Sequence, residues 1–199
     1  AAGPPRELRV RKFDGTLLAL DVGPGSTVRF LKEAVERATG VPPNEMRLVL
    51  GTEQIQRYDD AEVGSFLRDG ATDITLVRRP PEQARWLADV RADGLLLKDA
   101  PEEVQADAEV VLAAVSSNWR AVKHARAEAL EDREVLLAAV RDDWRALRHA
   151  GDGPRADRGV VLAAVEQSGV ALQFAGPSLQ ADREIAFMAV QKDWRAPQY

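Results

Sequence analysis

The amino-acid sequence predicts an α+β protein: a small mixed-sheet domain over residues 1–80, followed by an all-helical array over residues 82–199. Two observations predict this division. Before Pro80 and Pro81, short runs that alternate apolar and polar residues surround one amphipathic segment, as strands around a helix would. Beyond the two prolines, one apolar sequence motif recurs every 25 residues, which is typical of stacked helical units.

Turn and capping residues separate the expected elements of the first domain. Asp14 and Gly15 form a favoured hairpin turn between two alternating runs. Thr27 is a suitable N-cap for the amphipathic segment, and Gly40 is a suitable residue to end it. Strands are therefore expected at 8–13, 17–22, 47–50 and 74–77, with a helix between the second and third.

The order of these elements, and the residues at their junctions, resemble ubiquitin over residues 7–79. The likeness is clearest at 21–24, where a strand ends before the helix, and at 40–43, where the helix gives way to a third strand. It implies a ubiquitin-like β-grasp domain, a mixed sheet curled around one helix. It also implies protein binding through an apolar patch on the outer face of the sheet. The matching positions are Phe13, Val49 and Val77.

Strand alternation independently turns Val49 and Val77 outward if their neighbours Leu48 and Leu76 face the core. The same residues could instead pack against the helical part of the chain, and the sequence leaves both interpretations open. Ubiquitin ends in two glycines that are conjugated to other proteins, whereas this chain continues through two prolines. We therefore expect a built-in docking module rather than a modifier.

The array contains four clear copies of this apolar motif, and a degenerate copy precedes them. Each clear copy starts with an aspartate, a strong N-cap residue, and continues into a run such as Val-Val-Leu-Ala-Ala-Val. Because this run is apolar on every side, its helix should lie between neighbouring units. Twenty-five residues leave room for two short helices per unit, and such units stack into solenoids. The four copies begin at Asp107, Asp132, Asp157 and Asp182.

The copies resemble a family of short Asp-anchored helical repeats of protist and algal type, known as a domain of unknown function. The resemblance covers about residues 82–196 and depends on the Asp-x-Glu-Val-Val-Leu-Ala-Ala-Val motif. It implies a helical-repeat fold, and it implies no activity.

One position of the array holds either the largest or the smallest side chain: Trp119, Trp144 and Trp194 share it with Gly94 and Gly169. Such a position is not expected in a close-packed core, because the exchange would leave a large cavity. The tryptophans are therefore candidate protein-binding residues along an exposed edge. The alternative is that each indole covers the joint between two units, with local repacking where glycine occurs.

No residue pattern points to a catalytic, cofactor-binding or metal site. The absence of cysteine excludes thiol chemistry, and His124 and His149 occupy equivalent positions in units expected to lie about 8–10 Å apart. The net charge of −5 argues against a nucleic-acid partner. The longest apolar runs are far shorter than the roughly 20 residues of a transmembrane helix. We therefore expect no cofactor and no transmembrane segment.

These patterns predict a non-enzymatic protein–protein interaction or adaptor protein, with a helical scaffold beside a non-conjugatable docking domain. The alternative is a peripheral structural subunit of a large assembly, such as an algal organellar or photosynthetic complex. In both cases the partners are proteins whose identity the sequence does not give. The sequence leaves the location open: intracellular, in the cytoplasm, or in an organelle if a targeting peptide has been removed.

Overall fold

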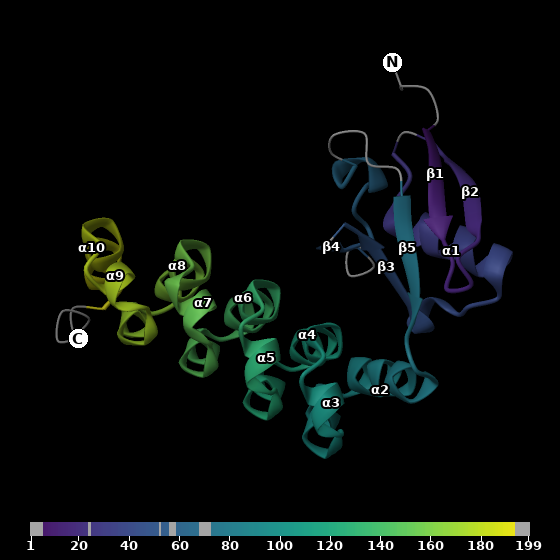
Figure 1. Ribbon diagram of the computed structural model, residues 1–199. Helices are drawn as coiled ribbons and strands as arrows, with labels where there is room; N and C mark the ends of the chain where they lie inside the picture. The colour runs from purple at the N-terminus through teal and green to yellow at the C-terminus, as the bar shows by residue number, and fades with distance from the viewer. Residues whose placement is uncertain (1–5, 24, 52, 56–58, 68–72, 194–199) are drawn as a thin grey trace. The chain divides into compact units, whose positions relative to one another are not determined.

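The computed structural model describes residues 6–23, 25–51, 53–55, 59–67 and 73–193 (Figure 1). The fold class is the predicted α+β: a ubiquitin-like sheet domain is followed by a mostly helical region. By its internal contacts the chain divides into two compact units, Ala1–Arg85 and Trp86–Tyr199. The boundary falls within helix α2 (Pro81–Ala92).

The first unit contains a five-stranded mixed sheet in the order β2-β1-β5-β3-β4. The central pair, β1 and β5, is parallel, and the other neighbouring strands are antiparallel. Among the described residues before α2, this unit also contains the helix α1 (Val28–Thr39) and the short 3-10 helices η1 (Pro43–Glu45) and η3 (Val63–Ser65). The strands are β1 (Arg6–Arg11), β2 (Leu17–Val22), β3 (Met46–Leu50), β4 (Glu53–Gln54) and β5 (Asp73–Arg78).

Local sequence accounts for the ends of α1 and for the first hairpin. The Thr27 hydroxyl accepts a hydrogen bond from the Phe30 N–H at 3.3 Å, which caps the start of α1. Gly40 ends the helix in the left-handed region at φ 72°, and Gly15 adopts φ 82° in the turn between β1 and β2. Glycine reaches these angles without the steric cost that a side chain would add.

The core of the first unit lies between α1 and the inner face of the sheet. Leu31 and Val35 of α1 are fully buried together with alternate residues of the strands. The buried strand residues include Leu8, Val10, Leu48, Ile74 and Leu76. Every member of this cluster belongs to residues 8–76.

The second unit consists of helices whose positions recur at intervals of 25 residues. Each of the intervals that begin at residues 108, 133 and 158 holds a long α-helix, then a six-residue 3-10 helix, then a helix of four or five residues. The sequence predicted two short helices per interval. The structure corrects this prediction in two ways: it adds a third helix, and the helix after the long one is a 3-10 helix. The long helices are α4 (Ala108–Ser117), α6 (Arg133–Asp142), α8 (Arg158–Val165) and α10 (Arg183–Lys192). The 3-10 helices are η4 (Gly94–Asp99), η5 (Trp119–His124), η6 (Trp144–His149) and η7 (Gly169–Phe174). The short helices are α3 (Glu102–Gln105), α5 (Ala127–Leu130), α7 (Asp152–Ala156) and α9 (Pro177–Gln180).

Aspartates begin the long helices, as the sequence predicted. The side chains of Asp107, Asp132, Asp157 and Asp182 each accept a hydrogen bond from a backbone N–H of the first turn, at 2.9–3.0 Å. Each bond satisfies a donor that the helix itself leaves unpaired.

Backbone hydrogen bonds join the short helices of successive intervals. Arg126 N–H donates to the Gln105 carbonyl at 2.9 Å, Gly151 N–H to Leu130 at 3.0 Å, and Gly176 N–H to Arg155 at 2.8 Å. The long helices α4, α6, α8 and α10 pack against one another in chain order, as Figure 1 shows. Together with buried residues of α2, the 3-10 helices and the short helices, their inward residues form one apolar cluster from Leu87 to Ala189. None of the described helices is long and apolar enough to span a bilayer.

Candidate protein-binding surfaces

The outer face of the sheet carries two of the three predicted patch residues. Burial alternates along β3 and β5, so Leu48 and Leu76 point into the core while Val49 and Val77 point away from it. Val77 is 43% exposed and Val49 is half-buried. In the antiparallel register, Val77 lies opposite Arg47 on the neighbouring strand. The two valines therefore occupy the same face of adjacent strands.

The third patch residue, Phe13, lies in the turn between β1 and β2 and is 65% exposed. The turn is held by a backbone bond from Lys12 N–H to Thr16, and by the Asp14 carboxylate, which accepts from the Thr16 hydroxyl at 2.6 Å. That hydroxyl bond, together with the Thr16 N–H, lowers the pKa of Asp14. Leu17, which starts β2, is also 53% exposed. Sequence reasoning did not select Leu17, although its place beside Asp14-Gly15 put it at the same hairpin tip.

Strands β1 and β5 of the sheet also carry arginines. Arg9 pairs with Asp73 at 2.8 Å, and Arg78 pairs with Glu45 at 2.7 Å. Arg11, at the end of β1, is exposed and lies opposite Thr75 in the parallel register.

Trp119 and Trp144 are half-buried and pack against the apolar cluster of the helical unit. The Arg120 guanidinium lies 4.9 Å from the centre of the Trp119 ring, and Arg145 lies 5.2 Å from that of Trp144. The Trp144 ring also lies 6.4 Å from that of Phe174. Each indole is thus partly covered by the cluster and by a guanidinium group, and it stays partly exposed. The predicted binding residue Trp194 lies outside the described residues.

The glycines at the equivalent positions are buried, which corrects the expectation that this position lies outside close packing. A Cβ atom on Gly94 would lie 2.1 Å from the Ala114 carbonyl oxygen. On Gly169 it would lie 2.0 Å from that of Ala189. The backbone of the next helix fills the space that a side chain would need. Two interpretations of this position were open: an exposed edge of tryptophans, or indoles that cover the contact between repeats with local repacking at the glycines. The close helix packing around Gly94 and Gly169 agrees with the second.

A groove of about 670 Å³ lies between α6 and α8, and sequence reasoning missed it. It lies where Gly159 occupies a register position that holds glutamate in the other clear copies. That missing side chain was the available signal in the sequence. The groove is lined by Arg133, Leu137, Arg141, Gly159, Leu162, Ala163, Glu166 and Gln167.

The titratable groups of the helical unit show no arrangement suited to metal binding: no cluster of three or more candidate ligands occurs among the described residues. Burial lowers the pKa of both His124 and His149, and nearby cations, Lys123 among them, lower it further. Hydrogen bonds from the Val160 N–H and from Arg133 outweigh the effect of burial and lower the pKa of Asp157.

Comparison with known proteins supports the division of the chain. The model of the ubiquitin family matches residues 8–81, and the model of a domain of unknown function (DUF4116) matches residues 157–196. Ubiquitin-like protein NEDD8 of Dictyostelium discoideum is 29% identical over 70 residues, which are 35% of this chain and 88% of that protein. Ubiquitin-like protein 1 of Schizosaccharomyces pombe is 31% identical over 70 residues, 35% of this chain and 87% of that protein. Through its N-terminal sheet domain, the chain belongs to the ubiquitin family.

Proposed function

We propose that the protein is a non-enzymatic adaptor that binds partner proteins through its ubiquitin-like domain. The observation that carries this proposal is the outward position of Val49 and Val77 on adjacent strands, with Phe13 exposed at the hairpin. Apolar side chains exposed together on one face of a domain, among polar and charged residues, are typical of protein-binding sites.

The way the domain continues into the rest of the chain supports docking rather than conjugation. Strand β5 ends at Arg78, and α2 begins at Pro81. The segment that follows the last strand thus enters a helix after two residues. A modifier needs a free, extended tail at this place, whereas a docking domain does not.

We further propose that the helical unit is a repeat scaffold of the solenoid type, with a 25-residue period that includes the DUF4116 match. The hydrogen bonds between successive short helices and the shared apolar cluster support this role. In such scaffolds each unit buries its apolar face against its neighbours and leaves the remaining side chains for binding. The partly exposed indoles of Trp119 and Trp144 are candidate anchors on this surface.

A second candidate function is that of a structural subunit in a larger assembly. The outward face of α10 favours it, because Phe187 is 64% exposed and Val190 is 42% exposed. The equivalent valines of the three preceding long helices, Val115, Val140 and Val165, are at most 2% exposed. A partner that covers this face of α10 would bury the same kind of apolar surface that is buried between the successive long helices.

The adaptor proposal is tested by replacing Val77 with aspartate in the full chain. Proteins captured from a native extract by wild-type and variant chains would be compared by quantitative mass spectrometry, with thermal melting recorded for both. We expect Val77→Asp to lose partners and to melt as wild type does, because its side chain points to solvent. Ala38→Asp, on the exposed side of α1, is the matched control. Capture of the same proteins by Val77→Asp would contradict docking through the sheet.

A further inference from the structure

At equivalent positions of the helical unit, an arginine of one long helix binds acidic residues at the start of the next. Between α8 and α10 the arginine has two carboxylate partners, and between α6 and α8 it has one. Between α8 and α10, Arg158 binds two carboxylates: its Nη1 lies 2.6 Å from Asp182, and its Nη2 lies 2.5 Å from Glu184. Both acids belong to the start of the next long helix, so one guanidinium connects two successive units. Such two-carboxylate contacts match the planar geometry of arginine.

Between α6 and α8, 25 residues earlier, the equivalent arginine has only one of the two carboxylate partners. Arg133 on α6 is the register equivalent of Arg158, and its Nε lies 2.9 Å from Asp157. Gly159 takes the position of Glu184, so the second acid is missing. A Cβ atom on Gly159 would lie 2.9 Å from Nη2 of Arg133, which shows that this nitrogen points toward the vacant side-chain position. Among the described residues, Asp157 is the only ion-pair partner of Arg133.

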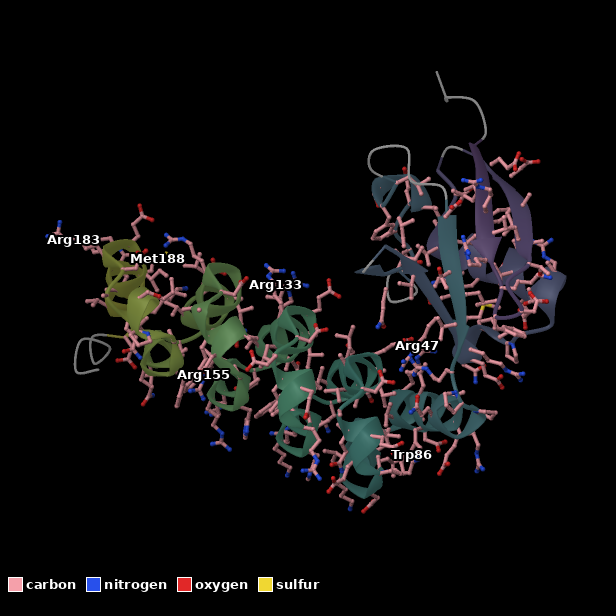
Figure 2. All side chains as sticks on the ribbon, in the orientation of Figure 1. Arg47, Trp86, Arg133, Arg155, Arg183 and Met188 are labelled. Carbon is pink, nitrogen blue, oxygen red and sulfur yellow. The ribbon has the colours of Figure 1, made fainter. Side chains whose placement is uncertain are left out.

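The vacant position opens into the groove between α6 and α8. Leu137, Leu162 and Ala163 supply apolar surface to this groove, beside Arg133 and Gly159. Arg141, Glu166 and Gln167 line it as well. Figure 2 shows Arg133 and Arg183, its register equivalent on α10, on the same side of the helical unit, with Arg155 on the other side. A volume of about 670 Å³ is within the range of sites that hold small ligands and short peptide segments.

We propose that this groove binds a short segment of a partner protein that carries a carboxylate next to a leucine-type side chain. The carboxylate takes the place of the missing glutamate and binds Arg133 as Glu184 binds Arg158. The neighbouring apolar side chain packs on Leu137 and Leu162. Because the Arg133 side chain is 55% exposed, its ion pair alone contributes little, and the apolar contact is needed for binding. The inference rests on the proposed scaffold role of the helical unit.

The test is NMR titration of the full chain with the peptide acetyl-Ala-Leu-Glu-Leu-Ala-amide. We expect saturable shifts in the millimolar range at the amides of Gly159, Leu162 and Ala163, and at the Arg133 side chain. The same peptide with glutamine in place of glutamate should bind roughly two- to fivefold more weakly, the range expected for one exposed ion pair. Absence of saturable shifts at these residues, or equal binding of the two peptides, would overturn the proposal.

Gly159→Glu is the decisive variant, because it supplies the missing carboxylate from the chain itself. The same register position holds glutamate in three other copies, so the variant is expected to fold, which a thermal melt checks. We expect it to weaken peptide binding at least as much as the exchange of glutamate for glutamine in the peptide does, while Arg183→Gln on α10 keeps wild-type binding. Undiminished binding by Gly159→Glu, or an equal loss in Arg183→Gln, would refute the site. Val77→Asp should bind the peptide normally, so a failure of docking through the sheet can be distinguished from a failure of this groove.

Discussion

At the residue scale, two glycines of the helical unit have opposite surroundings. Gly169 faces the backbone carbonyl of Ala189, which lies where a Cβ atom would stand. Gly159 faces the Nη2 end of the flexible Arg133 side chain, which can move aside. The same residue type therefore serves close helix packing at one position and leaves an open position at the other.

The first prediction compares substitutions at these two glycines. Gly169→Ala should lower the free energy of unfolding by about 1–3 kcal/mol or more, because the helices must separate to admit the methyl group. Gly159→Glu should raise it by roughly 1 kcal/mol, since glutamate favours helix more than glycine does and its charge suits a helix N-terminus. Urea denaturation of both variants measures the change. Equal and small effects would contradict the packing described for Gly169.

A second prediction concerns pH. Burial, reinforced by neighbouring cations, holds the pKa of His124 and His149 in the folded chain below the usual 6.5. Below about pH 6.5 the unfolded chain therefore binds protons that the folded chain does not, so stability is lost as the pH falls through this range. Denaturation at pH 7.5 and 5.5 should show lower stability at 5.5. The pKa values of Asp157 and Asp182 are lowered from 3.8, so both carboxylates stay ionised at pH 7.5 and at pH 5.5 and do not contribute to this change.

The control for the pH prediction is the double variant His124→Gln, His149→Gln. Its loss of stability between the two pH values should be smaller than that of the wild type. An identical loss would assign the pH dependence to other groups.

At the element scale, α6 separates the residues that hold the units together from those that line the groove. Leu136 is fully buried, whereas its neighbour Leu137 is half-buried and lines the groove. Leu136→Ala should cost about 2–5 kcal/mol of stability, and Leu137→Ala should cost less. Asp132→Ala should cost about 0.5–2 kcal/mol through loss of the cap. Chemical denaturation gives the order, and a larger loss for Leu137→Ala than for Leu136→Ala would contradict it.

Elements with a local sequence signal were predictable. The turn at Asp14-Gly15, the capped start of α1 and the aspartates of the long helices all lie where turn and capping chemistry placed them. Strand alternation gave the buried and outward positions of β3 and β5, since the two faces of a sheet alternate with every residue.

Other features had an ambiguous local pattern or depend on distances between separate elements. The 3-10 geometry of Trp119–His124 was missed, because its apolar pattern over six residues is also that of a short α-helix. The close approach of Ala189 to Gly169 has no local signal, since it depends on how closely two units stack. The groove beside Gly159 lies where one side chain is missing, and its shape depends on the spacing of α6 and α8.

At the scale of the whole molecule, the chain has two separate hydrophobic cores. One is formed by buried residues between Leu8 and Leu76, and the other by buried residues between Leu87 and Ala189. No described residue belongs to both clusters. Because each cluster lies within one compact unit, the two parts of the chain should fold as separate cooperative units.

This independence predicts the behaviour of a chain divided between Pro80 and Pro81, where α2 stays whole in the second fragment. Residues 1–80 alone should keep their sheet and melt cooperatively, with an unfolding enthalpy of roughly 55 kcal/mol from the usual value per residue. Residues 81–199 alone should remain helical, because every apolar side chain of their core is present. Circular dichroism and calorimetry of the fragments measure both. If residues 1–80 prove unfolded, their sheet needs the helical unit for stability; Val77 would then be expected to pack within the chain, and the structural-subunit role would gain support over the adaptor.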